Sequence, residues 1–375
     1  MKILINVSTL RSGGGFQVGL NVLATCLSND NNNNFYYLIN KNFINEVDFP
    51  KDKTFIVDDY PSNIFNFKNK KNIYKYLKDL KPDIVYSVGS PSYLNFKDSI
   101  EVMRLTNPWL IYSNQIAFKK INIYHKLKLK SQIFLKKIFL KNIDYFITQT
   151  EDAKINISKN LNKELENIKV IPNIYSYNLE KYKNIEFNKS YDNLINVLIF
   201  SANYFHKNIS ISISMAKELK QRKINNIRFV LTLPDEEFIT LKKEINFYGL
   251  DSYFLNKGKI KLDQIPKLYK DAHILFLPTL LEVFSVTFLE AMIFKLPIIT
   301  TDLSFNRDVC KNSALYFKDF EKGIDALDMI HKLIKSEDLR NNLIINGCNI
   351  VNDYKNNRNM YMEHIYYLKK IYDAN

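Results

Sequence analysis

Two glutamates, Glu282 and Glu290, are separated by seven residues in a stretch where a strand, a helix and a second strand are expected. The apolar run His273 to Leu277 predicts the first strand, Val286 to Phe294 the helix, and Pro297 to Thr301 the second strand. Ligands of parallel α/β sheets bind at the carboxyl ends of the strands. Glu282 falls in the loop at that end and Glu290 follows within the helix, so both carboxylates are candidates for binding hydroxyl groups.

The start of this helix is expected to bind an anion. Ser285 is a candidate N-cap, because its hydroxyl can accept a hydrogen bond from a free amide of the first turn. The amides of Phe284, Ser285 and Val286 would then face the ligand with the positive end of the helix dipole. A nucleoside diphosphate sugar combines such an anion with the hydroxyl groups that the two glutamates could bind. The alternative that stays open is an ordinary surface glutamate on a buried helix.

This stretch resembles the donor-site motif of the retaining GT-B glycosyltransferases of family 4 (glycosyl transferases group 1), which usually reads E-G-F-G-x-x-x-L-E-A-M-A-x-G-x-P-V-I. The matching residues are Glu282, Phe284, Leu289, Glu290, Ala291, Met292, Pro297 and Ile298. Val283, Ser285 and Lys295 stand where glycines are common, which puts the donor geometry in question. The resemblance implies that Glu290 accepts from the ribose hydroxyls and that Glu282 acts nearer the transferred sugar.

A lysine is expected on the diphosphate. The loop Ser201 to Ile209 follows a predicted strand, and in the resembled family its lysine contacts the donor diphosphate. Lys207 matches that lysine and His206 often accompanies it, whereas Ala202 stands near the position of the family arginine. A lysine at the carboxyl end of a strand can neutralise phosphate as a point charge. The alternative is one lysine among many in a basic chain. Arg307, beyond the strand that ends at Thr301, either contacts phosphate or caps a turn.

Four further candidate residues lie in the first half. Gly14 and Gly15 belong to a predicted loop before a helix, where glycines permit close approach of the backbone to a ligand. Glycines are also common in flexible turns, but in the resembled family such a loop faces the donor across the interdomain cleft. Asn107 could bond a ligand hydroxyl or cap the following turn. Asn173 lies at the family's I-P-N-G motif, where Ile174 replaces the glycine.

The alternation of apolar runs with helical stretches predicts an α/β protein. With the resemblance it implies the GT-B fold, in which two Rossmann-like domains with parallel sheets face each other across a cleft. We expect an acceptor domain at 1–175, a donor domain at 176–352 that starts with a polar linker at 176–193, and a C-terminal helix at 353–375 that crosses back to the first domain. The other expected strands are Lys2 to Val7, Phe35 to Ile39, Thr54 to Asp58, Asp83 to Val88, Glu101 to Thr106, Tyr145 to Thr148, Ile195 to Phe200, Phe229 to Leu233 and Tyr253 to Leu255.

Composition bounds these expectations. The 375 residues suffice for two domains, and 46% hydrophobic with 25% charged residues is typical of a globular protein. No apolar run reaches the roughly 18 residues of a membrane-spanning helix, and no secretory signal is recognised at the start. Three separated cysteines, Cys26, Cys310 and Cys348, predict neither disulfides nor a metal cage, and favour a cytoplasmic protein. Asp58-Asp59 falls short of an Asp-x-Asp metal site, so we expect no metal and no cofactor besides the donor.

The segment Lys119 to Lys141 contains eight lysines and no acidic residue, in a chain of net charge +14. Phe134, Leu135, Ile138 and Phe139 form an apolar stripe, and another face carries Lys126, Lys130, Lys137 and Lys141. Such a helix is typical of an anionic membrane surface, which would make the protein peripheral on the inner face of the membrane. The alternative left open is a core-facing helix with a lysine-rich solvent side.

Together with these observations, the resemblance implies a retaining glycosyltransferase that moves a sugar from a nucleoside diphosphate donor to a hydroxyl of a glycan or lipid-linked acceptor, in cell-surface glycan synthesis. In the resembled family Lys207 and Glu282 would be the catalytic residues. The alternatives are a GT-B relative such as a sugar-nucleotide epimerase or phosphorylase, and a basic nucleic-acid-binding protein. Lysines dominate over arginines and no nucleic-acid-binding module is recognisable, so we expect no nucleic-acid partner.

Overall fold

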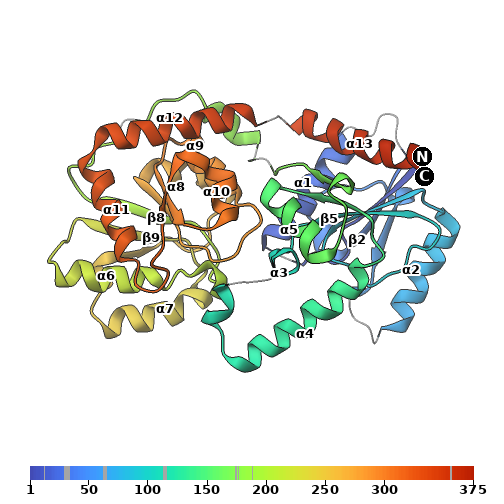
Figure 1. Ribbon diagram of the computed structural model, residues 1–375, viewed down its shortest axis with the longest axis horizontal. Coiled ribbons are helices and arrows are strands. Elements are labelled where there is room, and N and C mark those ends of the chain that lie inside the picture. The colour runs from blue at the N-terminus through green and yellow to red at the C-terminus, as the bar shows by residue number, and fades with distance from the viewer. Residues whose placement is uncertain are drawn as a thin grey trace. The chain divides into compact units, whose positions relative to one another are not determined.

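The chain forms two compact units (Figure 1). The computed structural model describes residues 1–11, 13–28, 34–61, 66–112, 116–173, 175, 177–187, 189–354 and 357–375. The first unit comprises Met1–Asn114, Ile123–Asn173 and Asn356–Asn375, and the second comprises Gln115–Asn122 and Ile174–Lys355. The main division therefore falls two residues before the boundary that we placed after residue 175.

The first unit is built on a seven-stranded sheet in the order β3-β2-β1-β4-β5-β6-β7, and every pair is parallel. Its strands are β1 (Lys2–Asn6), β2 (Asn34–Asn40), β3 (Thr54–Val57), β4 (Ile84–Gly89), β5 (Ile100–Leu105), β6 (Tyr145–Thr148) and β7 (Ile168–Val170). Ile3, Leu4 and Ile5 are all 0% exposed, because helices cover both faces of a parallel sheet. This is why the strands read as continuous apolar runs.

The second unit repeats the plan with six parallel strands in the order β10-β9-β8-β11-β12-β13. Its strands are β8 (Ile195–Ile199), β9 (Ile227–Leu231), β10 (Phe254–Asn256), β11 (Ile274–Leu277), β12 (Ile298–Thr301) and β13 (Ala314–Phe317). Counted within each unit, both sheets follow the doubly wound order 3-2-1-4-5-6, and the first adds one more strand. The predicted α/β fold with two Rossmann-like parallel sheets is confirmed.

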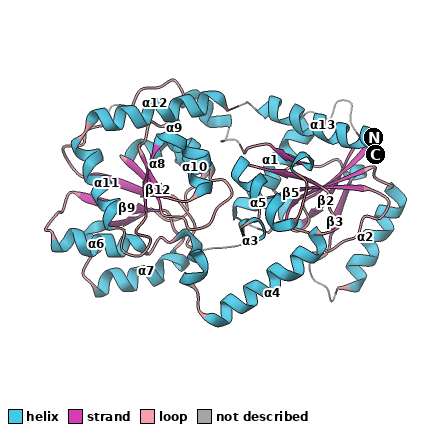
Figure 2. Cartoon of the chain, in the orientation of Figure 1, coloured by secondary structure: helices cyan, strands magenta, loops and turns pink. Residues whose placement is uncertain are grey.

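Helices cover both faces of each sheet (Figure 2). The first unit has α1 (Gly13–Ser28), α2 (Phe67–Leu80), α3 (Pro108–Ile111), α4 (Ile123–Leu140), α5 (Glu151–Leu161) and α13 (Asn357–Ala374). The second has α6 (Ile211–Gln221), α7 (Asp235–Phe247), α8 (Ile265–Asp271), α9 (Val286–Ile293), α10 (Ser304–Cys310), α11 (Ile324–Lys335) and α12 (Glu337–Asp353). Alternate residues of β11 serve the two faces, since Phe276 packs with α6 and α11 while Leu275 packs with α8 and α9.

The structure corrects three local predictions. The loop expected to run through Gly15 ends earlier, because α1 begins at Gly13 in the left-handed conformation that glycine favours (φ 72°). The C-terminal helix expected from residue 353 begins later, since Asp353 is the last residue of α12 and the final helix is α13 (Asn357–Ala374). The expected linker at 176–193 belongs to the second unit: Leu179 is buried in its core, and the Lys189 amine donates to backbone carbonyls at the end of α8.

The final helix, α13, packs on the first sheet beside α1 (Figure 1). Its apolar side chains Ile365, Leu368 and Ile371 join the buried core that contains Ile3 and Ile5. Arg104 of β5, only 1% exposed, adds a polar anchor by bonding the ring of His364 at 2.9 Å and the carbonyl of Ile171 at 3.0 Å. One buried guanidinium therefore joins the last helix, β5 and the end of β7.

Gly89, the last residue of β4, tests this architecture. Its φ is +100°, and a Cβ would lie 2.3 Å from Cδ2 of Leu10. We expect Gly89→Ala to destabilise the first unit by about 2–4 kcal/mol through strain and overpacking. Gly14→Ala is the matched control, because a Cβ there meets nothing within 4 Å. Urea unfolding followed by the fluorescence of Trp109, the single tryptophan, measures both. Equal stability of the two variants would contradict the prediction.

Candidate active site

The strand order of the second sheet reverses between β8 and β11, and polar loops follow both strands. These strands are hydrogen-bonded neighbours, with Leu198 opposite Leu275, so their carboxyl ends meet at one edge of the sheet. The loop after β8 contains a 3₁₀ turn at Phe205–Lys207, and the loop after β11 leads into α9. The amide of Leu280 donates to the carbonyl of His206 at 2.7 Å. The two loops are thus fixed to each other at the point where doubly wound sheets bind ligands.

Lys207 and Glu282 meet at this point. Their side chains form an ion pair between Nζ and Oε2, although 75 residues separate them in the chain. Each side chain is 19% exposed, so the pair is partly removed from water while both groups stay accessible. The Thr279 hydroxyl lies 3.5 Å from the same carboxylate oxygen. A cation and a carboxylate in this position can bind a phosphate and a hydroxyl group respectively.

A buried chain of polar groups supports the loop after β11. The Thr301 hydroxyl donates to the carbonyl of Thr279 at 2.6 Å, and Nδ2 of Asn306 donates to the Thr301 hydroxyl at 2.7 Å. All three residues are at least nine-tenths buried. The bonds tie the loop that carries Glu282 to β12 and α10. These residues were not predicted, although the threonines that end the β-branched run of β12 were a usable signal.

Glu290 lies within α9 and is 8% exposed. The hydroxyl of Tyr269, from α8, donates to its Oε2 at 2.7 Å. Burial raises the pKa of Glu290, and the bond from Tyr269 opposes that shift. Tyr269 was not predicted, because nothing in the sequence distinguishes it among 24 tyrosines.

The Ser285 side chain does not cap the backbone amides in the first turn of α9. The helix begins at Val286 and Ser285 occupies the N-cap position, but its hydroxyl makes no capping bond, so that part of the prediction is wrong. Phe284 is 8% exposed with its ring in the apolar core, which leaves only its backbone for a ligand. An anion can still bind at the helix start, because the orphan amides and the dipole remain.

Three positions at which the resembled family commonly has glycine differ in backbone conformation. Ser285 has φ −107°, and Val283 is absent from the residues with positive φ, so neither position requires glycine. Lys295 has φ +56°, the left-handed conformation that glycine adopts without strain. Its amine donates to the carbonyl of Lys183 at 3.0 Å and lies 3.0 Å from Sγ of Cys348. Only at Lys295 does the backbone retain the shape that a glycine would favour.

His206 and Arg307 are engaged within the protein. The His206 ring stacks on Tyr204 at 5.6 Å, and burial, aided by the neighbouring Lys207, lowers its pKa to about 3. The imidazole is therefore neutral at physiological pH. The Arg307 side chain is 53% exposed, pairs with Asp302 and lies 4.3 Å above the ring of Tyr316. Arg307 accordingly holds down the pKa of Asp302, and its contact with phosphate stays a prediction.

The remaining candidates belong to the first unit. Gly14 and Gly15 lie in the first turn of α1. Asn107 caps α3: its Oδ1 accepts from the amide of Trp109 at 3.0 Å, and its Nδ2 donates to Ser90 at 3.1 Å. Asn173 is 7% exposed and its Oδ1 accepts from the guanidinium of Arg104 at 2.9 Å. The capping alternative therefore holds for Asn107, and Asn173 supports the buried Arg104.

Metal ligands and membrane spans were both sought within the described residues. No three side chains of His, Cys, Asp or Glu in the described part of the chain are grouped so that they could hold a metal ion. Nor is any described helix long and apolar enough to cross a membrane.

Comparison with known proteins places this geometry in context. Among solved structures, HepE of Anabaena in complex with UDP and glucose is 14% identical, with a TM-score of 0.70 over 98% of this chain and 99% of that one. Sucrose-phosphate synthase of Thermosynechococcus elongatus is 13% identical, with a TM-score of 0.74 over 100% of both chains. WaaG, a glycosyltransferase involved in lipopolysaccharide biosynthesis, is 12% identical, with a TM-score of 0.71 over 96% and 98%.

These likenesses define the class of protein: the chain has the GT-B fold of glycosyltransferases. Residues 180–349 match the family described as Glycosyl transferases group 1. The match covers 170 of the 375 residues and includes the donor-site motif from Glu282 to Ile298. None of the curated proteins matches the chain.

A double-mutant cycle tests the contact between Lys207 and Glu282. Breaking a partly desolvated pair leaves one charge without its partner, so we expect Lys207→Met and Glu282→Gln each to destabilise the second unit. The double variant should lose less than the sum, with a coupling of about 1 kcal/mol. Urea unfolding followed by circular dichroism measures the cycle, while Trp109 fluorescence in the first unit should stay unchanged. Strict additivity would show that the two side chains do not interact in solution.

Proposed function

We propose that this protein is a retaining, metal-independent glycosyltransferase of group 1 that transfers a sugar from a nucleoside diphosphate donor to a hydroxyl acceptor. The observation that carries the proposal is the meeting of Lys207 and Glu282 at the switch point of the second sheet, beside the start of α9. UDP is the first nucleotide to test, since HepE was solved with UDP and with UDP-glucose.

Lys207 and the first amides of α9 hold the diphosphate in this mechanism. Without donor, Glu282 neutralises Lys207. A diphosphate takes over the lysine and frees the carboxylate to orient a hydroxyl of the sugar. The bond between the anomeric carbon and the phosphate oxygen breaks as the bond to the acceptor oxygen forms on the same face, and the leaving phosphate takes the acceptor proton. The protein supplies positioning and charge stabilisation.

Of the four candidate residues in the first unit, two remain available to contact the donor. Gly14 remains a site where a donor phosphate could approach the backbone, because the space beside its Cα is open. Gly15 is similarly accessible, since a Cβ at that position would meet only Cδ2 of Leu10, at 3.5 Å. Asn107 and Asn173 are committed to bonds within their own unit, so we assign them to structural support.

The acceptor is proposed to belong to a cell-surface glycan made at the inner face of the membrane. The likeness to WaaG, a lipopolysaccharide glycosyltransferase, is consistent with that role. A stronger argument comes from α4, in which Leu140 is the single buried residue of the helix. The exposed large apolar residues of α4 are Ile123, Tyr124, Leu127, Phe134, Leu135 and Ile138, at 41–70% exposure.

These six residues form one stripe. At about 100° per residue they fall within a sector of about 120°. Lys128 borders the stripe on one side, and Lys130 and Lys137 border it on the other. Apolar side chains exposed between lysines, in a segment without acidic residues, suit an anionic membrane surface. A core-facing helix would instead bury this stripe.

Two glutamate variants test the donor site. Glu290→Ala should weaken nucleotide binding by roughly 2–4 kcal/mol, because it removes the acceptor of the ribose hydroxyls. Glu282→Gln should nearly retain nucleotide affinity and lower turnover, since its interaction is realised mainly in the transition state. Calorimetry with UDP, GDP and ADP and turnover with the matching donor sugar separate the two effects. The reverse pattern would overturn these roles, and epimerisation or phosphorolysis of the donor would favour the alternative chemistries.

Sedimentation with liposomes tests the membrane surface. The protein should bind vesicles containing anionic lipid at low salt and leave them at high salt, because salt screens the attraction. Changing Lys126, Lys130, Lys137 and Lys141 to Gln should abolish binding without lowering thermal stability. Lys267→Gln with Lys318→Gln is the matched control, since both side chains are 80% exposed in the second unit. Binding that survives the four changes would reject α4 as the anchor.

A further inference from the structure

Tyr269 makes a buried contact with the proposed donor site. Its hydroxyl donates to Oε2 of Glu290 at 2.7 Å across 21 residues of sequence. Tyr269 is 0% exposed and Glu290 is 8% exposed, so both polar groups are buried together. The Tyr269 ring stacks on Phe294 at 5.2 Å with an interplanar angle of 7°, and meets Phe200 edge-on at 6.0 Å. The hydroxyl therefore points at the carboxylate from a fixed ring.

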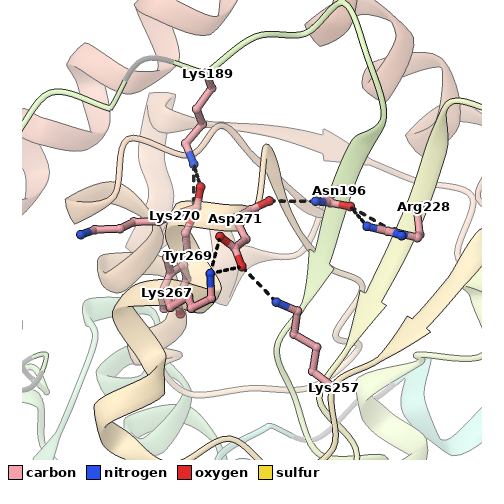
Figure 3. A network of polar contacts seen from close by, with 8 residues as sticks. All are labelled: Lys189, Asn196, Arg228, Lys257, Lys267, Tyr269, Lys270 and Asp271. Carbon is pink, nitrogen blue, oxygen red and sulfur yellow. Dashed lines mark hydrogen bonds and ion pairs between the residues drawn. The ribbon is translucent and has the colours of Figure 1, made fainter.

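Hydrogen bonds also fix the backbone at and after Tyr269, at the end of α8 (Figure 3). The Lys189 amine donates to the carbonyls of Tyr269, Lys270 and Ala272 at 3.1, 2.8 and 2.5 Å, and so satisfies the C-terminal carbonyls of α8. Burial lowers the pKa of Lys189 to about 8.

The last residue of α8 is fixed from the other side (Figure 3). The Asp271 carboxylate pairs with Lys257 at 3.1 Å. The backbone carbonyl of Asp271 accepts from Nδ2 of Asn196 at 2.9 Å. Asn196 in turn accepts from Arg228 at 3.1 Å. The network joins the end of α8 to β8 and β9, so that the sheet itself sets the position of the Tyr269 ring.

We propose that Tyr269 is a positioning residue for the donor nucleotide: its hydroxyl holds one oxygen of Glu290 and orients the other toward the ribose hydroxyls. The inference rests on the proposed donor site and deepens it. Among the described residues, the structure gives Oε1 of Glu290 no hydrogen-bond partner, whereas Oε2 is committed to Tyr269. One oxygen is thus occupied by the protein and one is left for a ligand.

The same bond favours the ionised form of Glu290. Burial raises its pKa and the Tyr269 hydroxyl opposes the shift, so loss of the hydroxyl should raise the pKa further. A protonated Glu290 is a poorer acceptor, and nucleotide affinity should then fall at a higher pH than in the wild type.

Three other ionisable groups near α9 have partners elsewhere. Glu180 accepts from the hydroxyl of Tyr175, and Lys183 lies 3.8 Å from the same Glu180. Lys295 bonds the Lys183 carbonyl and lies against Cys348 of α12. Tyr269 is therefore the ionisable side chain that acts directly on Glu290.

Tyr269→Phe tests the proposal, because it keeps the ring and removes the hydroxyl. Binding of UDP, GDP and ADP should be measured by calorimetry from about pH 5.5 to about pH 8.5, beside a ¹³C NMR titration of the glutamate carboxyls assigned with Glu290→Gln. We expect about tenfold weaker nucleotide binding near neutral pH, a smaller loss at the highest pH, and an upward shift of the Glu290 titration. The wild type should show its loss of affinity at lower pH.

Two matched controls separate positioning from packing. Tyr253→Phe removes another hydroxyl of the second unit, one that donates to Asn225 at 2.8 Å, and should change neither the affinity nor the titration of Glu290. Phe294→Leu disturbs the stack but keeps the hydroxyl, so it should lower stability without moving the titration midpoint. An unmoved midpoint in Tyr269→Phe, or an equal shift in Phe294→Leu, would overturn the proposal.

Failure of the donor site itself gives a different result. If Glu290→Gln binds every nucleotide as the wild type does, and UDP and 2′-deoxy-UDP bind alike, Glu290 does not read the ribose and the proposed donor site is wrong. The proposal for Tyr269 then falls with it, even if the NMR titration still moves. If Glu290→Gln weakens nucleotide binding but Tyr269→Phe does not, the donor site stands and only the role of Tyr269 is rejected.

Discussion

The contact between Lys207 and Glu282 exists because of the strand order of the second sheet. In a doubly wound sheet, the loops that follow the two central strands leave in opposite directions and open a space at the carboxyl edge. Here those strands are β8 and β11, and their loops carry the lysine and the glutamate. The first sheet has the same reversal between β1 and β4. Its loops are shaped by glycines: Gly89 at φ +100° lies against Leu10, beside the start of α1.

The second unit positions charge with buried neutral groups. Bringing a carboxylate out of water is unfavourable unless hydrogen bonds or an opposite charge compensate. The charge of Glu282 is compensated by the opposite charge of Lys207, whereas Glu290 is compensated only by the neutral hydroxyl of Tyr269. The amine of Lys189 is compensated by three backbone carbonyls. The first two contacts hold a carboxylate in place for a ligand, and the third fixes the end of α8. All three depend on residues that are distant in the sequence.

This dependence explains which features the sequence could predict. Buried parallel strands are long apolar runs, so most strands were found, and Tyr145–Thr148 was found with its bounds. The edge strands β7 and β13 were missed because they are short and mix polar with apolar residues, such as Lys169 and Tyr316. Lys207 and Glu282 were predicted from a resemblance. Tyr269 and the buried Arg104 act through contacts that only the folded chain creates, although a charge inside the apolar pattern of β5 was a signal for Arg104.

The distribution of charge adds an argument about where anionic partners act. The whole chain has a net charge of +14, and the segment from Lys119 to Lys141 alone contributes eight lysines without any acidic residue. An even spread would give a segment of this length about one net charge, so a general excess of lysine does not account for it. At the donor site, by contrast, Lys207 is balanced by Glu282. Six of these eight lysines lie in or directly after α4 of the first unit, whereas Lys119 and Lys120 belong to the second unit, which also contains the proposed donor site. An anionic surface and an anionic nucleotide would act on separate units, and the charge of α4 can be changed without altering the residues that hold the donor.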